Sequence, residues 1–304
     1  MASDQTTDDA PSEAVRVSVV LPCLNEVEAL EKLLPRIREL LPEAEILVVD
    51  DGSSDGSGEM AKGHGARVVR HPRPLGNGAA VKSGARHASG EILVFMDADG
   101  QHAPQDIPRL LKRLDAGYDM VVGARRPDTQ ATWYRRYANQ LYNGLASYMV
   151  NQEIPDLTSG FRAMRARRFR EFLHLLPNGF SYPTTITMAF FRAGYAVDYI
   201  EIAARQRAGS SHIKLLRDGF RFLLIISRVG TLYSPLKIFM PISGIFFLLA
   251  TFWYVVTLVD QGRFTNMSAL LYSASVVVFL IGLVSEQITM LLYQSHANAE
   301  DHDG

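Results

Sequence analysis

Two carboxylates separated by one residue, Asp97 and Asp99, stand directly after the apolar run 92–96, and Gln101 follows them. Carboxylate and amide oxygens are the ligands that hard divalent cations such as Mg²⁺ and Mn²⁺ prefer. The run is too short, and too rich in β-branched and aromatic residues, for a helix, which indicates a buried strand of a parallel sheet. Open α/β sheets bind ligands at the carboxyl ends of their strands. The pattern predicts a cation site, although a plain polar turn uses the same residue types.

A second acidic pair, Asp50 and Asp51, closes another short apolar run. Asn25 and Glu26 follow the first apolar run of the chain, residues 15–21. Because the carboxyl ends of parallel strands meet at one edge of a sheet, we expect these side chains around the same crevice. Carboxylates gathered there repel one another unless a cation or hydrogen-bond donors compensate them. A nucleoside diphosphate with a divalent cation would do so, with one carboxylate of the Asp50 pair binding base or ribose donors and the Asp97 pair holding the metal.

The turn Gly76-Asn77-Gly78 precedes a further helical stretch. Glycines at such a turn let the backbone approach a nucleotide closely. A tight helix start without any ligand uses them equally well, and both interpretations stay open.

An alternating α/β fold is needed to bring these residues together. Predicted strands cover residues 15–21, 45–51, 67–70, 92–96 and 120–122. Between them Leu and Ile recur at helical spacing, most clearly over residues 26–41 and again after Pro104. Strands that alternate with helices imply right-handed crossovers, and hence a Rossmann-like, mainly parallel sheet with helices on both faces.

Beyond residue 126 the regular alternation stops. Residues 130–150 are predicted to be helical, residues 156–162 form a polar loop that enters a short strand, and residues 195–202 alternate like an edge strand. We expect this second half to form the side of the site that binds a second substrate, the acceptor.

Two long apolar runs, 236–259 and 269–293, dominate the C-terminal part. The first would be about 36 Å long as a helix, enough to cross a bilayer. Because the linker 260–267 is too short to hold a domain, we predict a two-helix transmembrane hairpin over residues 235–294. A buried helical hairpin in a soluble core is the alternative.

The segment 213–234 joins the two parts. Its apolar residues alternate with Arg217, Arg221 and Arg228, as expected of an amphipathic helix in the headgroup plane, although packing on the catalytic domain would use the same pattern. Basic residues before position 236 outnumber the lone Arg263 of the linker. The excess predicts a multi-pass protein of the inner or plasma membrane with its large domain, residues 15–212, in the cytoplasm.

The overall composition narrows the function classes. A formal net charge of -1 argues against a general nucleic-acid binder. Cys23 is the only cysteine, which excludes an intrachain disulfide and a cysteine-based zinc site. The polar lead 1–14 does not look like a signal peptide, and we expect it and the polar tail 295–304 to be disordered.

Six short motifs occur in a fixed order along the chain. They are Pro22-x-x-Asn25-Glu26, Asp50-Asp51-Gly52-Ser53, Gly76-x-Gly78-x-Ala80, Asp97-Ala98-Asp99-x-Gln101-His102, Asp156-x-x-Ser159-Gly160-Phe161-Arg162 and Arg207-x-Gly209-x-Ser211. Together they resemble the family 2 inverting glycosyltransferases of the GT-A fold, and more narrowly the polyprenyl-phosphate branch typified by dolichyl-phosphate mannose synthases. The resemblance covers residues 15–293. No Gln-x-x-Arg-Trp string occurs, which counts against the processive polysaccharide synthases.

The resemblance implies a role for each matching residue. The Mg²⁺ or Mn²⁺ ligands would be Asp97, Asp99 and Gln101. The nucleotide-sugar site would contain Pro22, Asn25, Glu26, Asp50, Asp51, Asp97 and Arg207. The acceptor phosphate would meet Arg125, Ser159 and an arginine of the pair Arg135 and Arg136. The catalytic set would be Asp97, Asp99, Arg125, Arg207 and Asp156.

Two of these positions leave alternatives open. Asp156 would act as a base, orient Arg162 or simply cap its loop. Leu24 stands where many relatives have an aromatic residue that stacks on the base, so the base preference stays open.

The implied activity is inverting transfer of one sugar from a UDP- or GDP-hexose to undecaprenyl or dolichyl phosphate, giving a lipid-linked sugar for glycan assembly. One alternative is a membrane glycosyltransferase that acts on a hydroxyl of a lipid or glycan. Another is a non-catalytic membrane protein that binds nucleotide-sugars. The expected partners are the nucleotide-sugar, the polyprenyl phosphate and the lipid bilayer, without nucleic acid. The sequence leaves open which sugar is transferred and how long the lipid is. It also leaves open whether the protein forms a homo-oligomer.

Overall fold

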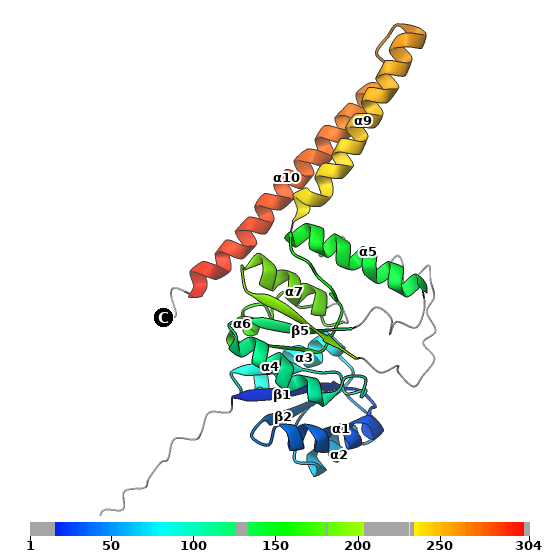
Figure 1. Cartoon of the computed structure of the whole chain (residues 1–304). Helices are drawn as coiled ribbons and strands as arrows, with labels where there is room; N and C mark the ends of the chain where they lie inside the picture. Colours follow the sequence, from blue (N-terminus) through cyan, green and yellow to red (C-terminus); the bar gives the residue numbers. More distant parts are fainter. Residues whose placement is uncertain (1–15, 126–132, 180–181, 204–230, 232–233, 301–304) are drawn as a thin grey trace, which may run out of the picture. The chain divides into compact units, whose positions relative to one another are not determined.

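A computed structural model of the 304-residue chain describes residues 16–125, 133–179, 182–203, 231 and 234–300, with backbone only at 133–139, 141 and 292–300 (Figure 1). The described residues fall into two compact units. The first unit takes those within 1–135, 158–190 and 194–208, and the second takes those within 136–157, 191–193 and 209–304. The predicted interfacial helix over 213–234 lies almost wholly outside the described residues.

The first unit is built on a sheet of seven strands in the order β3-β2-β1-β4-β6-β5-β7. The strands are β1 (Val17–Cys23), β2 (Glu45–Asp50), β3 (Arg67–Arg70), β4 (Ile92–Phe95), β5 (Met120–Arg125), β6 (Arg162–Arg165) and β7 (Val197–Ile202). All neighbours pair in parallel except β6, which runs antiparallel to both β4 and β5. The prediction of a mainly parallel α/β sheet is confirmed, with one reversed strand inside it. β7 lies at an edge, as its alternating pattern predicted.

The reversed strand matters for the position of the loop before it. Phe95, at the carboxyl end of β4, pairs with Arg162, at the amino end of β6. Because β6 runs antiparallel, the chain arrives at the edge where β4 delivers its acidic turn. The loop 158–161 therefore reaches the same edge of the sheet as Asp97.

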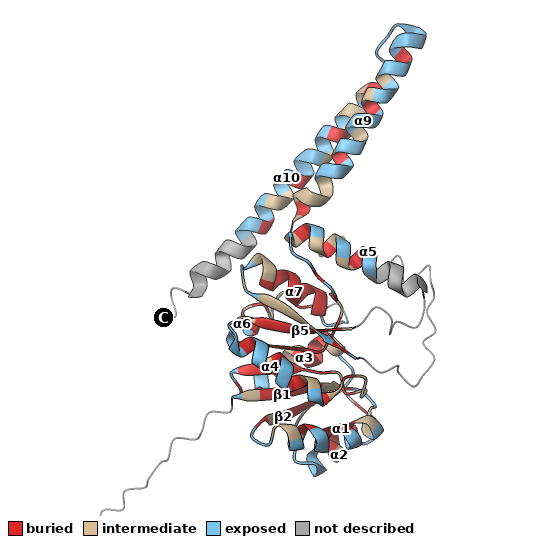
Figure 2. Cartoon of the chain, in the orientation of Figure 1, coloured by how far each residue is buried: buried red, intermediate tan, exposed pale blue. Residues whose placement is uncertain are grey.

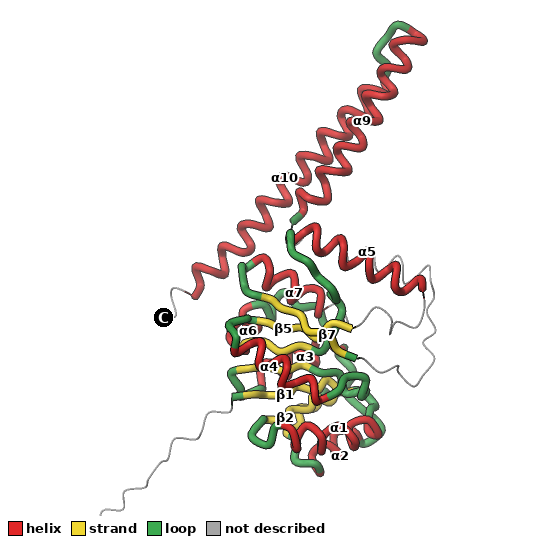
Figure 3. Tube along the Cα trace, viewed as in Figure 1, coloured by secondary structure: helices red, strands yellow, loops and turns green. Residues whose placement is uncertain are grey.

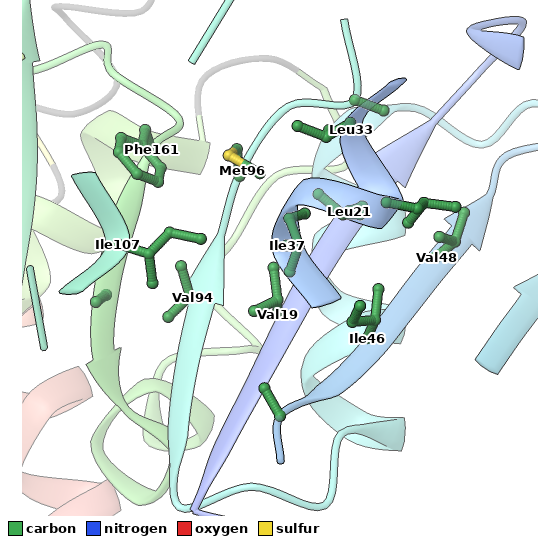
Figure 4. Close-up of a cluster of buried hydrophobic side chains, with 14 of the residues drawn as sticks. Val19, Leu21, Leu33, Ile37, Ile46, Val48, Val94, Met96, Ile107 and Phe161 are labelled. Carbon is green, nitrogen blue, oxygen red and sulfur yellow. The ribbon is translucent and has the colours of Figure 1, made fainter. Parts of the chain in front are cut away.

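Helices cover both faces of the sheet (Figure 3). They are α1 (Val27–Leu40), α2 (Ser57–Gly63), α3 (Asn77–His87), the short 3-10 turn η1 (Pro104–Asp106), α4 (Ile107–Asp115), α6 (Ala166–Glu171) and α7 (Tyr182–Arg192). Figure 4 shows the core on one face, where Ile37 of α1 and Ile107 of α4 join Val19, Ile46 and Val94 of the strands in one buried cluster.

Helix α1 follows directly from its sequence. Its buried residues Leu30, Leu33, Leu34 and Ile37 recur at helical spacing, and each is almost fully inaccessible to solvent. Burying a side chain of this size contributes roughly 1.5–3 kcal/mol. Pro35 lies on the exposed side, where it does not interrupt this packing.

The opposite face is covered by α3 and α6. Gly84 of α3 lies so close to the sheet that a Cβ there would be 2.3 Å from Val20 Cγ1 and 3.3 Å from Val49 Cγ2. Phe169 of α6 packs on Phe95 with ring centroids 4.9 Å apart. Glycine thus permits a closer approach of helix and sheet than alanine would.

Two helices, α6 and α7, have no counterpart in the sequence analysis. Helix α7 is buried at every residue from Tyr182 to Phe190. A helix buried all round has no polar face, so its sequence lacks the periodicity by which surface helices are predicted.

The second unit contains α5 (Trp133–Val150), α9 (Pro235–Gln261) and α10 (Asn266–Glu300). Helices α9 and α10 form a hairpin (Figure 1), held by reciprocal hydrogen bonds in which Ser243 Oγ donates to the Ser275 carbonyl and Ser275 Oγ to the Ser243 carbonyl, each 2.9 Å. Gly282 permits close packing, because a Cβ there would be 2.6 Å from Phe239 Cβ. Small residues and polar pairs of this kind are typical of helix contacts in membranes.

Both hairpin helices are long and apolar enough to cross a bilayer, over Pro235–Gln261 and Asn266–Leu291. Only 17% of the most apolar window of each is buried within the described structure. Figure 2 shows exposed residues along much of both helices. A buried hairpin of a soluble core would have most of this surface inside, so two candidate membrane spans are the better account of the exposed apolar faces.

Charged side chains organise the start of α9. Lys237 Nζ donates to the carbonyls of Tyr148 (3.0 Å) and Met149 (2.8 Å) in the last turn of α5. Glu286 of α10 accepts a 3.2 Å hydrogen bond from the Leu236 backbone N–H. Each charge therefore lies at the helix end whose dipole it complements, a cation at the C-terminus of α5 and a carboxylate at the N-terminus of α9.

Candidate active site

The acidic turn after β4 presents a partly exposed carboxylate at the carboxyl edge of the sheet. The strand is fully buried, whereas the side chain of Asp97 is 38% exposed. Among the described residues no donor hydrogen-bonds to the Asp97 carboxylate, and the nearest basic atom is His102 Nε2, 3.8 Å from Oδ2. Asp99 Oδ1 accepts a 3.1 Å hydrogen bond from the Gln101 backbone N–H. That bond closes the turn and brings the Gln101 residue back toward Asp99.

The donor set of this turn fits a hard divalent cation. Within the described part of the chain, no three His, Cys, Asp or Glu side chains form a metal site by themselves. Asp97, Asp99 and the Gln101 amide would therefore supply part of a coordination sphere. Mg²⁺ and similar ions are commonly bound by one or two carboxylates, with waters and substrate phosphates completing the sphere.

The acidic pair after β2 behaves differently, because both carboxylates are buried. Asp51 accepts 2.8 Å hydrogen bonds from the backbone N–H groups of Leu75 and Gly76, and its Oδ1 lies 2.6 Å from His71 Nδ1. His71 Nε2 in turn lies 2.8 Å from Ser83 Oγ. Asp51 thereby fixes the loop before α3 rather than presenting its carboxylate at the surface.

Asp50 is satisfied at one oxygen only, since its buried Oδ2 has no hydrogen-bond partner among the described residues. Its Oδ1 accepts a 2.7 Å hydrogen bond from the Ser53 backbone N–H, and its Oδ2 lies 3.4 Å from Nε of the half-exposed Arg70. Arg70 also donates to the Ser53 carbonyl at 3.2 Å.

The loops after β1 and β2 are tied together. The Asn25 backbone N–H donates to Ser53 Oγ (3.0 Å), and Asn25 Oδ1 accepts from the Ser54 N–H (2.9 Å). The Glu26 N–H donates to Ser57 Oγ at 3.1 Å. Pro22 lies in β1 opposite Val49 of β2. The structure thus brings together the residues predicted to follow these two strands.

The Gly76-x-Gly78 turn is explained by the chain itself. A Cβ at Gly78 would lie 2.1 Å from the Pro177 carbonyl oxygen, and one at Gly76 would lie 2.5 Å from that of Asn178. The Ala79 backbone N–H donates to the same Asn178 carbonyl at 3.1 Å. Of the two interpretations left open, the contacts favour a tight helix start packed against residues 177–179.

The loop 158–161 and its surroundings form the second side of the site. Arg125, at the end of β5, donates to Thr158 Oγ1 at 2.6 Å, and Ser159 is buried. Arg162 is completely buried and donates to the Ser159 and Pro183 carbonyls and to Thr187 Oγ1.

Tyr182 is a residue of this region that the sequence analysis did not single out. Its hydroxyl donates to the Gly160 carbonyl at 3.3 Å. Burial raises the pKa of Tyr182 well above its usual value; the Arg162 guanidinium opposes this rise and the Asp97 carboxylate adds to it. The phenol therefore stays protonated as a donor. No local pattern could have identified it, since it lies within the all-buried helix α7.

Other predicted residues belong to the second unit or fall outside the described residues. Asp156 is buried and belongs to the second unit. The side chains of Arg135 and Arg136, within α5, and the whole of Arg207 lie outside the described residues.

Comparisons with known proteins agree with this architecture. The family model described as Glycosyl transferase family 2 matches residues 18–173, and the model described as GtrB C-terminal hairpin matches residues 234–291. The chain is 39% identical over 168 residues to the undecaprenyl-phosphate 4-deoxy-4-formamido-L-arabinose transferase of Edwardsiella ictaluri (strain 93-146), covering 52% of this chain and 51% of that protein. The chain thus spans about half the length of this relative.

A second relative aligns over most of the chain. It is the enzyme of the same name from Proteus mirabilis (strain HI4320), 28% identical over 296 residues, which are 90% of this chain and 88% of the relative. Among solved structures, glucosyl-3-phosphoglycerate synthase from Mycobacterium tuberculosis, in complex with Mn²⁺, UDP and glucosyl-3-phosphoglycerate, superimposes with a TM-score of 0.58 at 24% identity, over 71% of this chain and 80% of that one. This likeness supports the predicted GT-A fold. Because this family model matches residues 18–173, half of the chain, including β4 and its acidic turn, the chain belongs to glycosyl transferase family 2.

Proposed function

We propose that this protein transfers one sugar from a nucleotide-sugar to a polyprenyl phosphate, with inversion at the anomeric carbon. The observation that carries the proposal is the union, in one chain, of a family 2 domain with an open acidic turn and a hairpin of two apolar helices. The names of both relatives describe transfer to undecaprenyl phosphate, which supports this class of acceptor.

Asp97, Asp99 and Gln101 would hold the divalent cation, Mg²⁺ or Mn²⁺. The open carboxylate of Asp97 supports this assignment, as do the Mn²⁺ and UDP held by the structural neighbour. When bound, such a cation acts as a Lewis acid that stabilises the departing nucleoside diphosphate. The chain's own contribution is to hold the two carboxylates at the edge of the sheet.

The acceptor needs little help to become a nucleophile. A phosphate monoester has a second pKa of about 6, so it is mostly dianionic at neutral pH. It can attack the anomeric carbon from the face opposite the nucleotide, which gives inversion without a strong general base. The site must instead supply positive charge that brings two anions together.

Among the described residues, Arg125 is our candidate for supplying that charge. Its guanidinium donates to Thr158, in the loop 158–161 that reaches the same edge of the sheet as Asp97. By resemblance, Ser159, Arg207 and one of Arg135 and Arg136 would share the task. We place Asp156 as a base only in the alternative enzyme that uses a hydroxyl acceptor, since a hydroxyl has a proton to lose.

The hairpin would anchor the catalytic domain, residues 15–212, at the cytoplasmic face of the membrane. Basic residues between 205 and 237 outnumber Arg263 in the linker, which supports this orientation. The isoprenoid tail of the acceptor would then stay in the bilayer while its phosphate enters the site.

The test is an incubation of membranes containing the protein with labelled UDP- and GDP-sugars and undecaprenyl phosphate, followed by lipid extraction. We expect label in the lipid fraction with one of the donors, and its loss when EDTA removes the divalent cation. Undecaprenol, which has the same tail without the phosphate, is the matched control acceptor. Transfer to undecaprenol or diacylglycerol, with none to the phosphate, would contradict the proposal in favour of a hydroxyl acceptor.

A further inference from the structure

We propose that Gly160 is a positioning residue for Asp97: its missing side chain lets the 158–161 backbone rest against the Asp97 carboxylate and hold it as a metal ligand. The inference rests on the proposed function and adds a residue to it. Gly160 touches neither nucleotide nor acceptor in this account. It acts only through Asp97.

The Asp97 carboxylate lies where a side chain at position 160 would begin. A Cβ built on Gly160 would lie 2.8 Å from Asp97 Oδ2, 3.2 Å from Oδ1 and 3.3 Å from Cγ, and these are the three nearest atoms. Gly160 is not among the glycines with positive φ, so its backbone conformation is one that alanine also adopts. The carboxylate, rather than the backbone angle, is what requires glycine here.

The loop beneath the carboxylate is held on three sides. The Gly160 carbonyl accepts from the buried Tyr182 hydroxyl at 3.3 Å, and the Phe161 carbonyl accepts from the Gly123 N–H of β5 at 2.9 Å. The buried Arg162 guanidinium donates through Nε to the Ser159 carbonyl at 3.2 Å. The residues before and after Gly160 are therefore anchored to the sheet and to α7.

The same loop also supports His102, a second neighbour of Asp97. The ring of Phe161 stacks on His102, with centroids 5.1 Å apart and planes inclined by 21°. His102 is buried and presents Nε2 3.8 Å from Asp97 Oδ2. Asp97 Oδ2 thus lies near both the Gly160 backbone and an imidazole on which Phe161, the next residue of the loop, stacks.

These contacts decide which partner would move if a methyl group were added. The loop is anchored and buried, whereas the Asp97 carboxylate is the free end of a partly exposed side chain. Gly160→Ala should therefore displace the carboxylate and leave the loop in place. Groups that orient a metal ligand from behind typically affect metal affinity by about 10- to 100-fold when altered.

The test is a titration of the purified full-length protein with Mn²⁺ in the presence of UDP, with free Mn²⁺ measured by EPR. This readout needs neither the lipid acceptor nor sugar transfer. We expect Gly160→Ala to weaken Mn²⁺ binding by about 10- to 100-fold with a thermal unfolding midpoint close to that of the unaltered protein. Gly63→Ala is the matched control, because a Cβ there meets nothing within 4 Å, and its Mn²⁺ affinity should be unchanged.

A second variant keeps the inference testable if Gly160→Ala does not fold. Tyr182→Phe removes the hydroxyl that holds the Gly160 carbonyl without adding an atom, and should weaken Mn²⁺ binding by about fivefold. Unchanged Mn²⁺ affinity in a folded Gly160→Ala protein, or in Tyr182→Phe where the alanine variant is unfolded, would overturn the inference.

Asp97→Asn distinguishes a failure of the Gly160 inference from a failure of the proposed metal site. If it abolishes Mn²⁺ binding while Gly160→Ala binds normally, the metal site stands and the positioning role falls. If Asp97→Asn itself binds Mn²⁺ normally, Asp97 is not a ligand, and both the metal assignment of the proposed function and the role of Gly160 are wrong.

Discussion

Asp51 and Asp97 follow β2 and β4, the two strands that flank β1, but their surroundings differ. Asp51 is surrounded by backbone N–H groups and His71, which compensate its charge inside the fold. Asp97 has no such donors among the described residues and keeps 38% of its side chain exposed. A buried carboxylate without donors would be costly, so the open one is the better candidate for a cation. The supply of donors, rather than the residue type, distinguishes the buried Asp51 from the open Asp97.

Removing one of the proposed metal ligands, Asp99, tests the metal site at the level of a single residue. Asp99→Asn keeps the size of the side chain and removes its charge, and we expect lipid-linked sugar transfer to fall by about 10²- to 10³-fold because stabilisation of the leaving diphosphate is lost. The rate is measured by lipid extraction at saturating donor. Asp115→Asn, which alters an exposed ion pair with Arg16, is the control and should transfer at the normal rate. Normal activity in Asp99→Asn would remove this residue from the metal site.

At the scale of elements, hydrogen bonds at the opposite edge of the sheet hold the strand starts together. Glu45, the first residue of β2, accepts from Ser18 of β1, from the Ser89 backbone N–H at 2.7 Å and from Arg67 of β3 at 2.9 Å. Burial works to raise the pKa of Glu45, but the Ser18 hydroxyl, the Ser89 N–H and the Arg67 guanidinium together lower it below its usual value. The ionised carboxylate is therefore the form that joins β1, β2 and β3.

A pH dependence follows from the direction of that shift. Because the pKa of Glu45 is lower in the folded than in the unfolded chain, its contribution is fully present above the unfolded value of about 4.3 and is lost as the pH falls through the folded value. Glu45→Gln should cost about 1 kcal/mol of unfolding free energy at pH 7 and progressively less below pH 4. Thermal unfolding of the catalytic domain, followed in the full-length protein at pH 7 and again below pH 4, measures this cost. An equal cost at both would mean that the charge plays no part.

The element that decides the geometry of the site is β6. Its reversal places the amino end of the strand beside the carboxyl end of β4, so that the 158–161 loop meets the acidic turn. Had β6 run parallel, that loop would enter the sheet at the opposite edge. The contact of Gly160 with Asp97 is thus a consequence of strand direction.

At the scale of the whole molecule, the proposed membrane orientation can be tested by labelling single cysteines. The only native cysteine, Cys23, is buried in β1, and burial raises the pKa of its thiol, so it should react slowly with maleimides. A cysteine introduced at an exposed position therefore reports its own side of the membrane without background labelling.

Two such positions test the proposed orientation. Gln261 is exposed at the end of α9, and Lys62 is exposed on α2. In intact cells a membrane-impermeant maleimide should label Gln261→Cys, while Lys62→Cys should be labelled only after permeabilisation. The opposite pattern would place the catalytic domain outside the cytoplasm and contradict the proposal.

Much of this protein could be predicted from local patterns. Short apolar runs that end in Asp predicted β2 and β4 and the acidic turns that follow them. The helical spacing of Leu and Ile predicted α1, despite the proline at position 35. The length of two apolar runs predicted the hairpin helices α9 and α10. These features depend on the burial of one face or on the thickness of a bilayer, and both leave a periodicity or a length that can be read in sequence.

The tertiary structure alone decided how distant segments meet. It placed β6 in reverse between β4 and β5, turned Asp50 and Asp51 inward, packed Gly76 and Gly78 against residues 177–179, and set Gly160 beneath Asp97. Helix α7 left no signal because it is buried on every side. Strand direction and donor supply depend on packing between segments far apart in the chain, and a local pattern records how deeply a residue is buried but not which residue it meets.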